Sequence, residues 1–235
     1  MLFDLPKLQL LIREIQPIKS PISENIIIYD ILGSTNQTLW ELLEQGHPQG
    51  TSVIALQQTA GRGQWGRQWQ SHPGGLYLSW SIPWGVGSGD VRELGNWEQG
   101  EIGGIRIENV PNLLPLTPGP QSVAPQLTLF SAWGIAKTLH SYEIPVYIKW
   151  PNDLIWQGKK LGGILTETRM QGAKITRAIV GVGINWANPV PETGINLQSC
   201  LTITSLEQLA AITIQGLITG YHQWCSVTDE TDNDL

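Results

Sequence analysis

Short apolar stretches recur along the chain at two different periods, and each period predicts one kind of element. Residues 76–82, Leu-Tyr-Leu-Ser-Trp-Ser-Ile, alternate at period two, which predicts a half-buried strand. Short continuous apolar runs predict a buried strand at 26–29 and further strands at 51–56, 146–150 and 174–186. The sequence therefore predicts a sheet of at least five strands.

One pair of strands is predicted to be a hairpin. Residues 153–156 and 161–168 flank Gln157-Gly158-Lys159, a sequence that is typical of a tight turn. The long strand at 174–186 is expected to expose an edge along which two copies of the chain could pair. Both a monomer and a homodimer therefore stay open.

Helices follow from apolar positions spaced three or four residues apart. Residues 126–141 and 205–225 carry such stripes, and residues 8–15 predict a shorter helix. The order is early strands, a helix, a run of strands and a final helix. This order predicts an α+β domain on a mixed, mostly antiparallel sheet.

A further helix, at 35–45, is predicted from the residues at its ends. Ser34 and Gln37 have the spacing of a capping box, in which two side chains satisfy the first backbone N–H groups. Gly46 suits the position just after the last turn, where a left-handed residue is usual.

The domain organisation follows from changes in composition. Residues 26–228 are expected to form one domain, preceded by an extension at 1–25 and followed by an acidic tail at 229–235. Residues 85–125 contain eight glycines and five prolines, which predicts an insertion with one short strand at 105–107.

The overall composition excludes several classes of protein. Hydrophobic residues make up 41% and charged residues 14% of the 235, which is typical of a globular chain. The net charge of −6 argues against non-specific nucleic-acid binding. Two cysteines without a CxxC motif indicate a reducing, cytoplasmic setting, and we find neither a signal peptide nor a membrane-spanning apolar run.

Within this acidic chain, residues 58–69, Gln-Thr-Ala-Gly-Arg-Gly-Gln-Trp-Gly-Arg-Gln-Trp, concentrate glycine and positive charge. Glycines can turn backbone N–H groups toward an anion, and Arg62 and Arg67 add donors that suit phosphate or carboxylate oxygens. The stretch predicts an anion-binding loop. The alternative is a glycine-rich surface loop with incidental arginines.

A fixed cation is predicted at the end of the strand at 146–150. Period two points Lys149 away from the apolar face, and Pro151 ends the strand beside it. Lys149 could therefore stabilise a substrate carboxylate or charge developing on phosphorus. Asn152 and Asp153 offer oxygen ligands for a Mg²⁺ ion shared with substrate phosphates. The alternative is a solvated lysine before an ordinary turn.

Two glycine pairs lie inside predicted strands. Gly162 and Gly163 indicate either a close approach by another group or a β-bulge. Gly181 and Gly183 leave a flat slot on one strand face, with Asn185 at its end. An aromatic base could lie in that slot, and the alternative is tight helix-on-strand packing.

Taken together, these segments resemble the biotin protein ligases, in the family's order and with similar spacing, over roughly residues 26–225. The matching pieces are Ser34-Thr35-Asn36, Gln58 to Gly63 with Gly66-Arg67 and Trp69, Lys149 to Leu154, Lys160 to Leu165, and Gly181 to Asn185. The resemblance implies a fold related to class II aminoacyl-tRNA synthetases, with helices on one side of a mixed sheet.

The resemblance also implies an ATP-dependent, AMP-forming ligase. Biotin would be activated as biotinyl-5′-AMP with Mg²⁺-ATP, and then transferred to a lysine of a biotin carboxyl carrier protein or domain of acetyl-CoA carboxylase. The alternatives are a lipoate or octanoate ligase or transferase, and a protein that binds biotin or biotinyl-AMP without transferring it.

Site residues are carried over by motif. Lys149 and Arg62 are expected to be catalytic, and Asp153 is the expected metal ligand. The expected biotin pocket consists of Ser34, Thr35, Asn36, Gln58, Arg62, Gly63, Gln64 and Lys149. The expected nucleotide site consists of Arg62, Arg67, Trp69, Asn152, Lys160, Gly181, Gly183 and Asn185.

The sequence departs from the family pattern in three ways. Many relatives carry a third arginine where Gln64 stands, so we expect the adenylate to be held less firmly here. About 25 residues precede the catalytic region, so we expect no helix-turn-helix domain and no DNA partner. Residue 235 leaves no room for the C-terminal barrel of bacterial relatives, so we expect a short form with less cover over the nucleotide and carrier.

Overall fold

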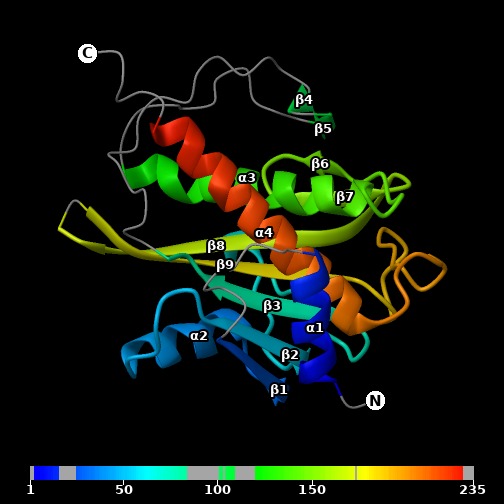
Figure 1. Ribbon diagram of the computed structural model, residues 1–235, viewed down its shortest axis with the longest axis horizontal. Helices are drawn as coiled ribbons and strands as arrows, with labels where there is room; N and C mark the ends of the chain where they lie inside the picture. Colours follow the sequence, from blue (N-terminus) through cyan, green and yellow to red (C-terminus); the bar gives the residue numbers. More distant parts are fainter. Residues whose placement is uncertain are drawn as a thin grey trace.

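The computed structural model describes residues 3–15, 25–83, 101–102, 104–108, 120–172 and 174–229. Their strands form a nine-stranded sheet in the order β1-β2-β3-β9-β8-β7-β6-β5-β4 (Figure 1). The strands are β1 (Ile26–Leu32), β2 (Ser52–Gln58), β3 (Leu76–Ser81), β4 (Glu101–Ile102), β5 (Ile105–Glu108), β6 (Tyr147–Lys149), β7 (Asp153–Trp156), β8 (Lys159–Gln171) and β9 (Lys174–Ile184). The helices are α1 (Leu5–Ile15), α2 (Thr35–Glu44), α3 (Pro120–His140) and α4 (Leu206–Asp229).

The sheet is mixed and mostly antiparallel, as predicted. The pairs β1–β2 and β5–β6 are parallel, and the other neighbours are antiparallel. The predicted hairpin is confirmed: β7 and β8 are joined by Gln157 and Gly158, whose φ values of 50° and 74° fit a tight two-residue turn. The prediction that β9 exposes a free edge is wrong for Ile179–Ile184, because this half of the strand pairs with both β3 and β8.

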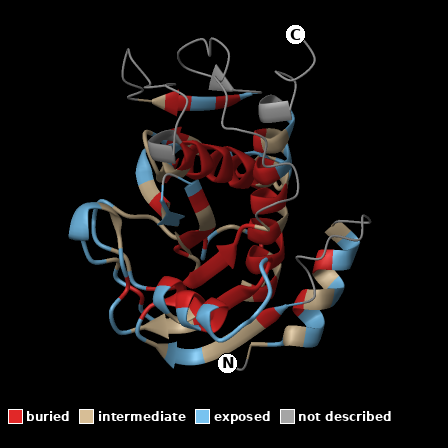
Figure 2. Ribbon diagram, turned by 90° about the vertical axis from the view of Figure 1, so that its left-hand side faces the viewer, coloured by how far each residue is buried: buried red, intermediate tan, exposed pale blue. Residues whose placement is uncertain are grey.

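Helices cover both faces of the sheet, and two neighbouring residues of β2 show how. Val53 packs with Leu39 and Leu43 of α2, whereas Ile54 faces the main core, which contains residues of α1, α3 and α4. Successive side chains of a strand point to opposite faces. Three helices therefore share one face, as predicted, while α2 covers part of the other. In Figure 2 the buried residues concentrate in the crossing helices and the adjacent strands.

Burial differs from the prediction in two strands. All of β3 is buried instead of half, because its polar face meets α2 and the site: Ser79 Oγ lies 2.6 Å from Asn36 Oδ1. Conversely, in β1 only Ile26 is buried, because β1 is paired on one side alone, by β2. Composition of a strand does not reveal its position in a sheet.

Helices α3 and α4 cross at unusually close range behind the central strands. A Cβ on Gly134 would overlap the Gly216 carbonyl oxygen, and one on Gly220 would overlap that of Phe130. Helix α3 is in turn tied to β8, since Thr128 Oγ1 donates to Thr166 Oγ1 at 2.7 Å. This layer fixes β8, which carries several residues of the candidate site.

The helix predicted near the N-terminus is present, and α3 begins at Pro120, inside the segment 85–125 that was expected to be an insertion. Helix α1 starts three residues earlier than expected and packs on α4, and its Leu8 and Ile12 join the main core. Strand β5 confirms the one predicted at 105–107, while the rest of the predicted insertion up to residue 119 lies largely outside the described residues, as does the tail after Asp229. Among the described helices, none has the length and apolar character needed to cross a membrane.

Candidate functional site

A cavity of about 340 Å³ opens on the α2 face of the sheet, where the loop after β2 meets β6, β7, β8 and β9. It joins segments that lie far apart in the sequence. Fifteen of the sixteen residues predicted for the site line it: Ser34, Thr35, Asn36, Gln58, Arg62, Gly63, Gln64, Arg67, Trp69, Lys149, Asn152, Asp153, Lys160, Gly181 and Gly183.

One end of the cavity is a buried polar floor at the start of α2. Gln58 Oε1 accepts from the backbone N–H of Thr35 at 2.8 Å, and Gln58 Nε2 donates to Ser71 Oγ at 2.8 Å. Ser79 Oγ lies 2.7 Å from Thr35 Oγ1. The polar atoms of the floor are therefore held in fixed positions by one another.

The predicted capping box is wrong, although the helix itself is confirmed. Ser34 is the N-cap residue but makes no side-chain cap bond, and Gln37 donates to Glu41 instead. Gln58, on a neighbouring strand, satisfies the first N–H group of the helix. The C-terminal prediction holds: Gly46 has φ 95°, and His47 N–H donates to Leu42 O, as in a Schellman motif.

The glycine-rich stretch forms a small, tight hairpin. Trp69 N–H donates to Gly61 O at 3.0 Å, and Gly63 N–H donates to Arg67 O at 2.7 Å. Its crest is a short 3-10 turn, Gln64–Gly66, in which Trp65 adopts φ 58° and is 89% exposed. Among the glycines of this stretch Gly66 alone uses the left-handed region, at φ 72°, and anion binding by the loop stays a prediction.

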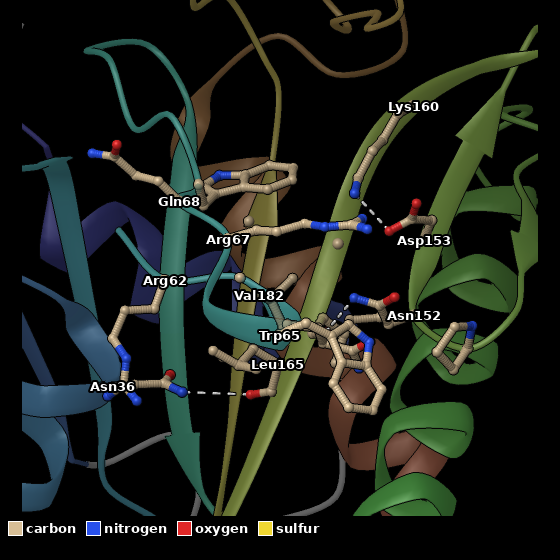
Figure 3. A pocket seen from close by; sticks show the side chains of 18 of the residues that line it. Asn36, Arg62, Trp65, Arg67, Gln68, Asn152, Asp153, Lys160, Leu165 and Val182 are labelled. Atoms are coloured by element: carbon tan, nitrogen blue, oxygen red, sulfur yellow. Dashed lines mark hydrogen bonds and ion pairs between the residues drawn. The ribbon is translucent and has the colours of Figure 1, made fainter. Parts of the chain in front are cut away.

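Pairing within this hairpin decides where its two arginines point. Arg62 and Gln68 form a β-bridge, so their side chains share one face, and Arg67 and Trp69 take the other. In Figure 3 Arg67 crosses the cavity toward Asp153, whereas Arg62 turns away on the side of Asn36. The guanidinium of Arg62 there pairs with Glu167 Oε1 at 2.9 Å.

The slot left by the glycines of β9 is filled by the protein itself. A Cβ on Gly183 would lie 2.5 Å from Nε1 of Trp69, and one on Gly181 would overlap Oδ1 of Asn36. The alternative of tight helix-on-strand packing holds at Gly181, and at Gly183 the indole of Trp69 lies where the base of a ligand was expected. The Trp69 N–H is buried without a hydrogen-bond partner among the described residues, which leaves a donor for a ligand.

Gly162 and Gly163 of β8 lie at a β-bulge and also at a close backbone approach, the two alternatives that the sequence left open. Leu161 is bulged out of register between β7 and β8, because Leu154 pairs with Gly162 and Ile155 with Lys160. A Cβ on Gly162 would lie 2.7 Å from the Gly183 carbonyl oxygen. A bulge and a close backbone approach therefore occur side by side.

The far end of the cavity is strongly cationic. This end is lined by Arg67, Lys149 and Lys160 against one carboxylate, Asp153, although the whole chain carries −6. Lys160 Nζ lies 2.6 Å from Asp153 Oδ1 and 5.3 Å from the centroid of the Trp69 ring. Even with that ion pair counted, the field in the cavity favours an anionic ligand.

Lys149 occupies the position that the strand pattern predicted. Val146 and Ile148 are buried, and Lys149 on the opposite face is exposed at the cavity. Asn152 Nδ2 donates to Ile164 O at 2.9 Å, which fixes the residue before Asp153 (Figure 3). The turn that follows β6 therefore presents its polar groups in a defined orientation.

Asn185 is the one predicted site residue outside the cavity. Its Nδ2 donates to Ile195 O at 3.2 Å, and its Oδ1 accepts from Asn188 at 3.0 Å. Its backbone N–H donates to Leu161 O. Asn185 thus organises the loop after β9, and this arrangement favours a structural role.

Metal binding was expected at Asp153. Among the described residues, no group of three or more His, Cys, Asp or Glu could hold a metal by itself. A lone carboxylate is still compatible with Mg²⁺, which commonly uses one or two carboxylates, water and substrate phosphates. Asp153 fits the role of such a single carboxylate ligand when its ion pair with Lys160 opens or when Lys160 and the metal share the carboxylate.

Several lining residues were missed by the sequence reasoning: Trp65, Gln68, Trp150, Pro151, Gly163, Ile164, Leu165 and Val182. Most lie inside the recognised segments, so their position in those segments was a usable signal. Glu167 was also missed, and no local pattern distinguishes it from other strand carboxylates.

Comparisons with known proteins point to one family. Residues 29–86 and 113–185 match the Biotin/lipoate A/B protein ligase family. The chain is 33% identical over 165 residues to the bifunctional ligase/repressor BirA of Bacillus subtilis, covering 69% of this chain and 40% of that protein. It is 29% identical to a biotin–acetyl-CoA-carboxylase ligase of Paracoccus denitrificans, covering 60% and 46% respectively. The chain thus spans less than half the length of these two relatives.

A solved structure extends the agreement to the fold. The biotin protein ligase of Aquifex aeolicus in complex with biotin and ATP superposes with a TM-score of 0.59 and 25% identity. The superposition covers 86% of this chain and 72% of that one.

Proposed function

The chain belongs to the Biotin/lipoate A/B protein ligase family, and from this premise we propose that it is an ATP-dependent biotin protein ligase. Its substrates would be biotin, ATP and a lysine of a biotin carboxyl carrier protein. The observation that carries the proposal is the two-ended cavity, with a buried polar floor at one end and converging cations at the other. Biotin has the same polarity, with a ureido ring at one end and a carboxylate at the other.

The polar floor supports biotin over lipoate. A ureido ring offers two N–H donors and a carbonyl acceptor, which match the hydroxyl and amide groups of Ser34, Thr35 and Asn36. The dithiolane of lipoate would leave buried polar groups facing an apolar ligand, and such mismatches are costly. Leu165, half-buried on the cavity side of β8, would lie along the apolar chain of biotin.

The cationic end supports activation of the carboxylate. In the first step a biotin carboxylate oxygen attacks the α-phosphorus of ATP, the bond to the bridging oxygen of the β-phosphate breaks, and pyrophosphate leaves. Lys149 and Arg67 would draw the two anions together and offset the charge that develops on phosphorus. Bound Mg²⁺ would neutralise phosphate charge, with Asp153 as its protein ligand.

The second step transfers biotin to the carrier. The carrier lysine, as a free amine, attacks the acyl carbon of the mixed anhydride, AMP leaves and the amine loses a proton. The hairpin of residues 61–69 would lie over the anhydride and exclude water until the lysine arrives. A carrier domain is supported as the partner by the named activity of the Paracoccus denitrificans relative.

The proposal is tested by incubating the protein with ATP, biotin and a biotin carboxyl carrier domain. We expect ATP-dependent labelling of one carrier lysine, and pyrophosphate exchange that depends on biotin. Lys149→Ala should lower kcat by about 10²-fold or more while the protein stays folded, since it removes one preorganised cation from the reacting anions.

The outcomes separate the alternatives. Exchange that depends on lipoate or octanoate instead of biotin would assign the chain to the other branch of its family. Tight binding of biotin without labelling of the carrier would identify a binding protein. Labelling that survives Lys149→Ala unchanged would contradict the role given to that lysine.

A further inference from the structure

We propose that Glu167 is a positioning residue that fixes the hairpin of residues 61–69 against α2, and that Arg62 serves this clamp instead of touching the reacting atoms. The inference rests on the proposed function, because it assigns the clamp to biotin and ATP binding. It also departs from the expectation that Arg62 is catalytic.

The two oxygens of the Glu167 carboxylate bind two different segments. Oε1 pairs with the Arg62 guanidinium at 2.9 Å, and Oε2 accepts from Nε1 of Trp40 at 2.9 Å. Trp40 is a buried residue of α2, and the Glu167 side chain is 19% exposed. One carboxylate on β8 thus joins the hairpin to the helix.

The joined segments are the ones that shape the cavity. The hairpin carries Arg67 and Trp69 on its inner face, and α2 begins with Thr35 and Asn36 at the polar floor. Because β8 is held from behind by α3, Glu167 provides a fixed point for both. A shift of the hairpin would move the cationic end relative to the floor.

Little else holds the outer side of the hairpin. There it borders an open hollow of about 490 Å³, lined by Arg62, Glu167, Trp65 and Leu165 among others. Among the described residues, Arg62–Glu167 is the ion pair that ties this hairpin to the sheet. Without it, the loop would be retained on that side mainly by its backbone ends, and it could move into the hollow.

A second carboxylate near Trp40 provides a matched control. Glu44, also on α2, pairs with Arg169, whose guanidinium lies 4.3 Å from the centroid of the Trp40 ring on the outside of the helix. The Glu44 side chain is 56% exposed and does not contact the hairpin. Glu44→Gln therefore removes a charge and an ion pair of α2 but leaves both partners of the Glu167 carboxylate, Arg62 and Trp40 Nε1, unchanged.

The expected kinetic signature is a change in KM and not in kcat. If the clamp only raises the fraction of molecules whose hairpin is in the binding position, its loss lowers that fraction. The apparent dissociation constant for the substrate then rises in the same proportion. Saturating substrate restores the closed loop, so kcat persists. For a pair with a half-exposed arginine, the effect of Glu167→Gln should be about fivefold in KM.

The experiment measures biotin-dependent pyrophosphate exchange for wild type, Glu167→Gln, Arg62→Gln, the double variant and Glu44→Gln. We expect KM for biotin to rise about fivefold in both single clamp variants, with kcat within about twofold, and the double variant to be no worse than either. Glu44→Gln should match wild type. An unchanged KM, or a fall in kcat alone, would overturn the proposal.

A second readout does not depend on the proposed function. Trypsin cleavage after Arg67, followed by mass spectrometry without substrates, reports how often the hairpin opens. We expect Glu167→Gln to be cleaved about fivefold faster than wild type and Glu44→Gln. Equal cleavage rates would refute the clamp. Faster cleavage in a protein that shows no exchange with biotin would uphold the clamp and reject the ligase assignment.

Discussion

Substitution of Gly183 by alanine should push the Trp69 indole out of its place on β9. The added Cβ would lie 2.5 Å from Nε1 and 2.6 Å from Cε2 of the ring, distances that real Cβ contacts do not show. The Trp69 backbone cannot easily shift to relieve this overlap, because its N–H donates to Gly61 O within the hairpin. The ring must therefore move away from β9, which changes its contact with Lys160.

The magnitude follows from packing. Adding a methyl group to a well-packed site commonly costs about 1–3 kcal/mol. The contact of Lys160 Nζ with the Trp69 ring, 5.3 Å from its centroid, adds about 0.5 kcal/mol if it is lost. We expect the free energy of unfolding to fall by about 2 kcal/mol, with weaker ATP binding, since the displaced ring narrows the cavity.

Gly163, the cross-strand partner of Gly183, is the matched control. A Cβ there would lie 3.4 Å from Cζ3 of Trp69, an ordinary contact, and its φ is outside the left-handed region. Gly163→Ala should therefore leave the stability unchanged or raise it by about 0.5 kcal/mol. Urea denaturation of wild type and both variants is the assay. Equal stability losses in the two variants, or none in Gly183→Ala, would refute this account of the slot.

Three further predictions concern other parts of the molecule. Gly134→Ala should lower Tm by about 6–12 °C in a thermal melt, because a Cβ overlapping Gly216 O costs about 3 kcal/mol; an unchanged Tm would show that the helices can separate. Burial raises the pKa of the Glu207 carboxyl, but hydrogen bonds from neighbouring N–H, hydroxyl and ammonium donors lower it more, so the folded pKa lies below 4.5. Wild type should therefore have a larger free energy of unfolding than Glu207→Gln at neutral pH, and this difference should shrink as the pH falls below 4.5. A difference that persists in acid would contradict the prediction. Gln64→Arg should slow release of the adenylate about tenfold, because a charged hydrogen bond to phosphate is stronger than a neutral one by about 1.4 kcal/mol; equal release rates would reject that role.

Much of the fold could be predicted because its signals are local. The apolar stripe of α3 from Leu129 to Leu139 lies in the main core, and the Gln157-Gly158 turn lies where the hairpin was expected. Period two also oriented Lys149 correctly, because a strand residue and its neighbour must face opposite sides. Such features depend on a few adjacent residues and need no knowledge of distant partners.

The features that were not predictable depend on partners far along the chain. Gln58 takes over the N-terminal cap of α2 because β2 runs beside that helix end, which the capping-box spacing of Ser34 cannot indicate. The slot at Gly183 was visible as two absent side chains, but its occupant, Trp69, comes from a loop over a hundred residues earlier. The burial of β3 likewise follows from its central place in the sheet.

The two arginines of the hairpin show how a motif can combine different roles. By sequence Arg62 and Arg67 are equivalent, since both follow or flank glycines in one cationic loop. The bridge between Arg62 and Gln68 separates them, because it assigns them to opposite faces of the hairpin. Arg67 crosses the cavity toward Asp153 (Figure 3), whereas Arg62 lies at the other side of the cavity lining and pairs with Glu167. A glycine-rich loop is too flexible to hold Arg67 and Trp69 in position by itself. The anchoring of the loop by Arg62 therefore keeps Arg67 placed for its role in the site.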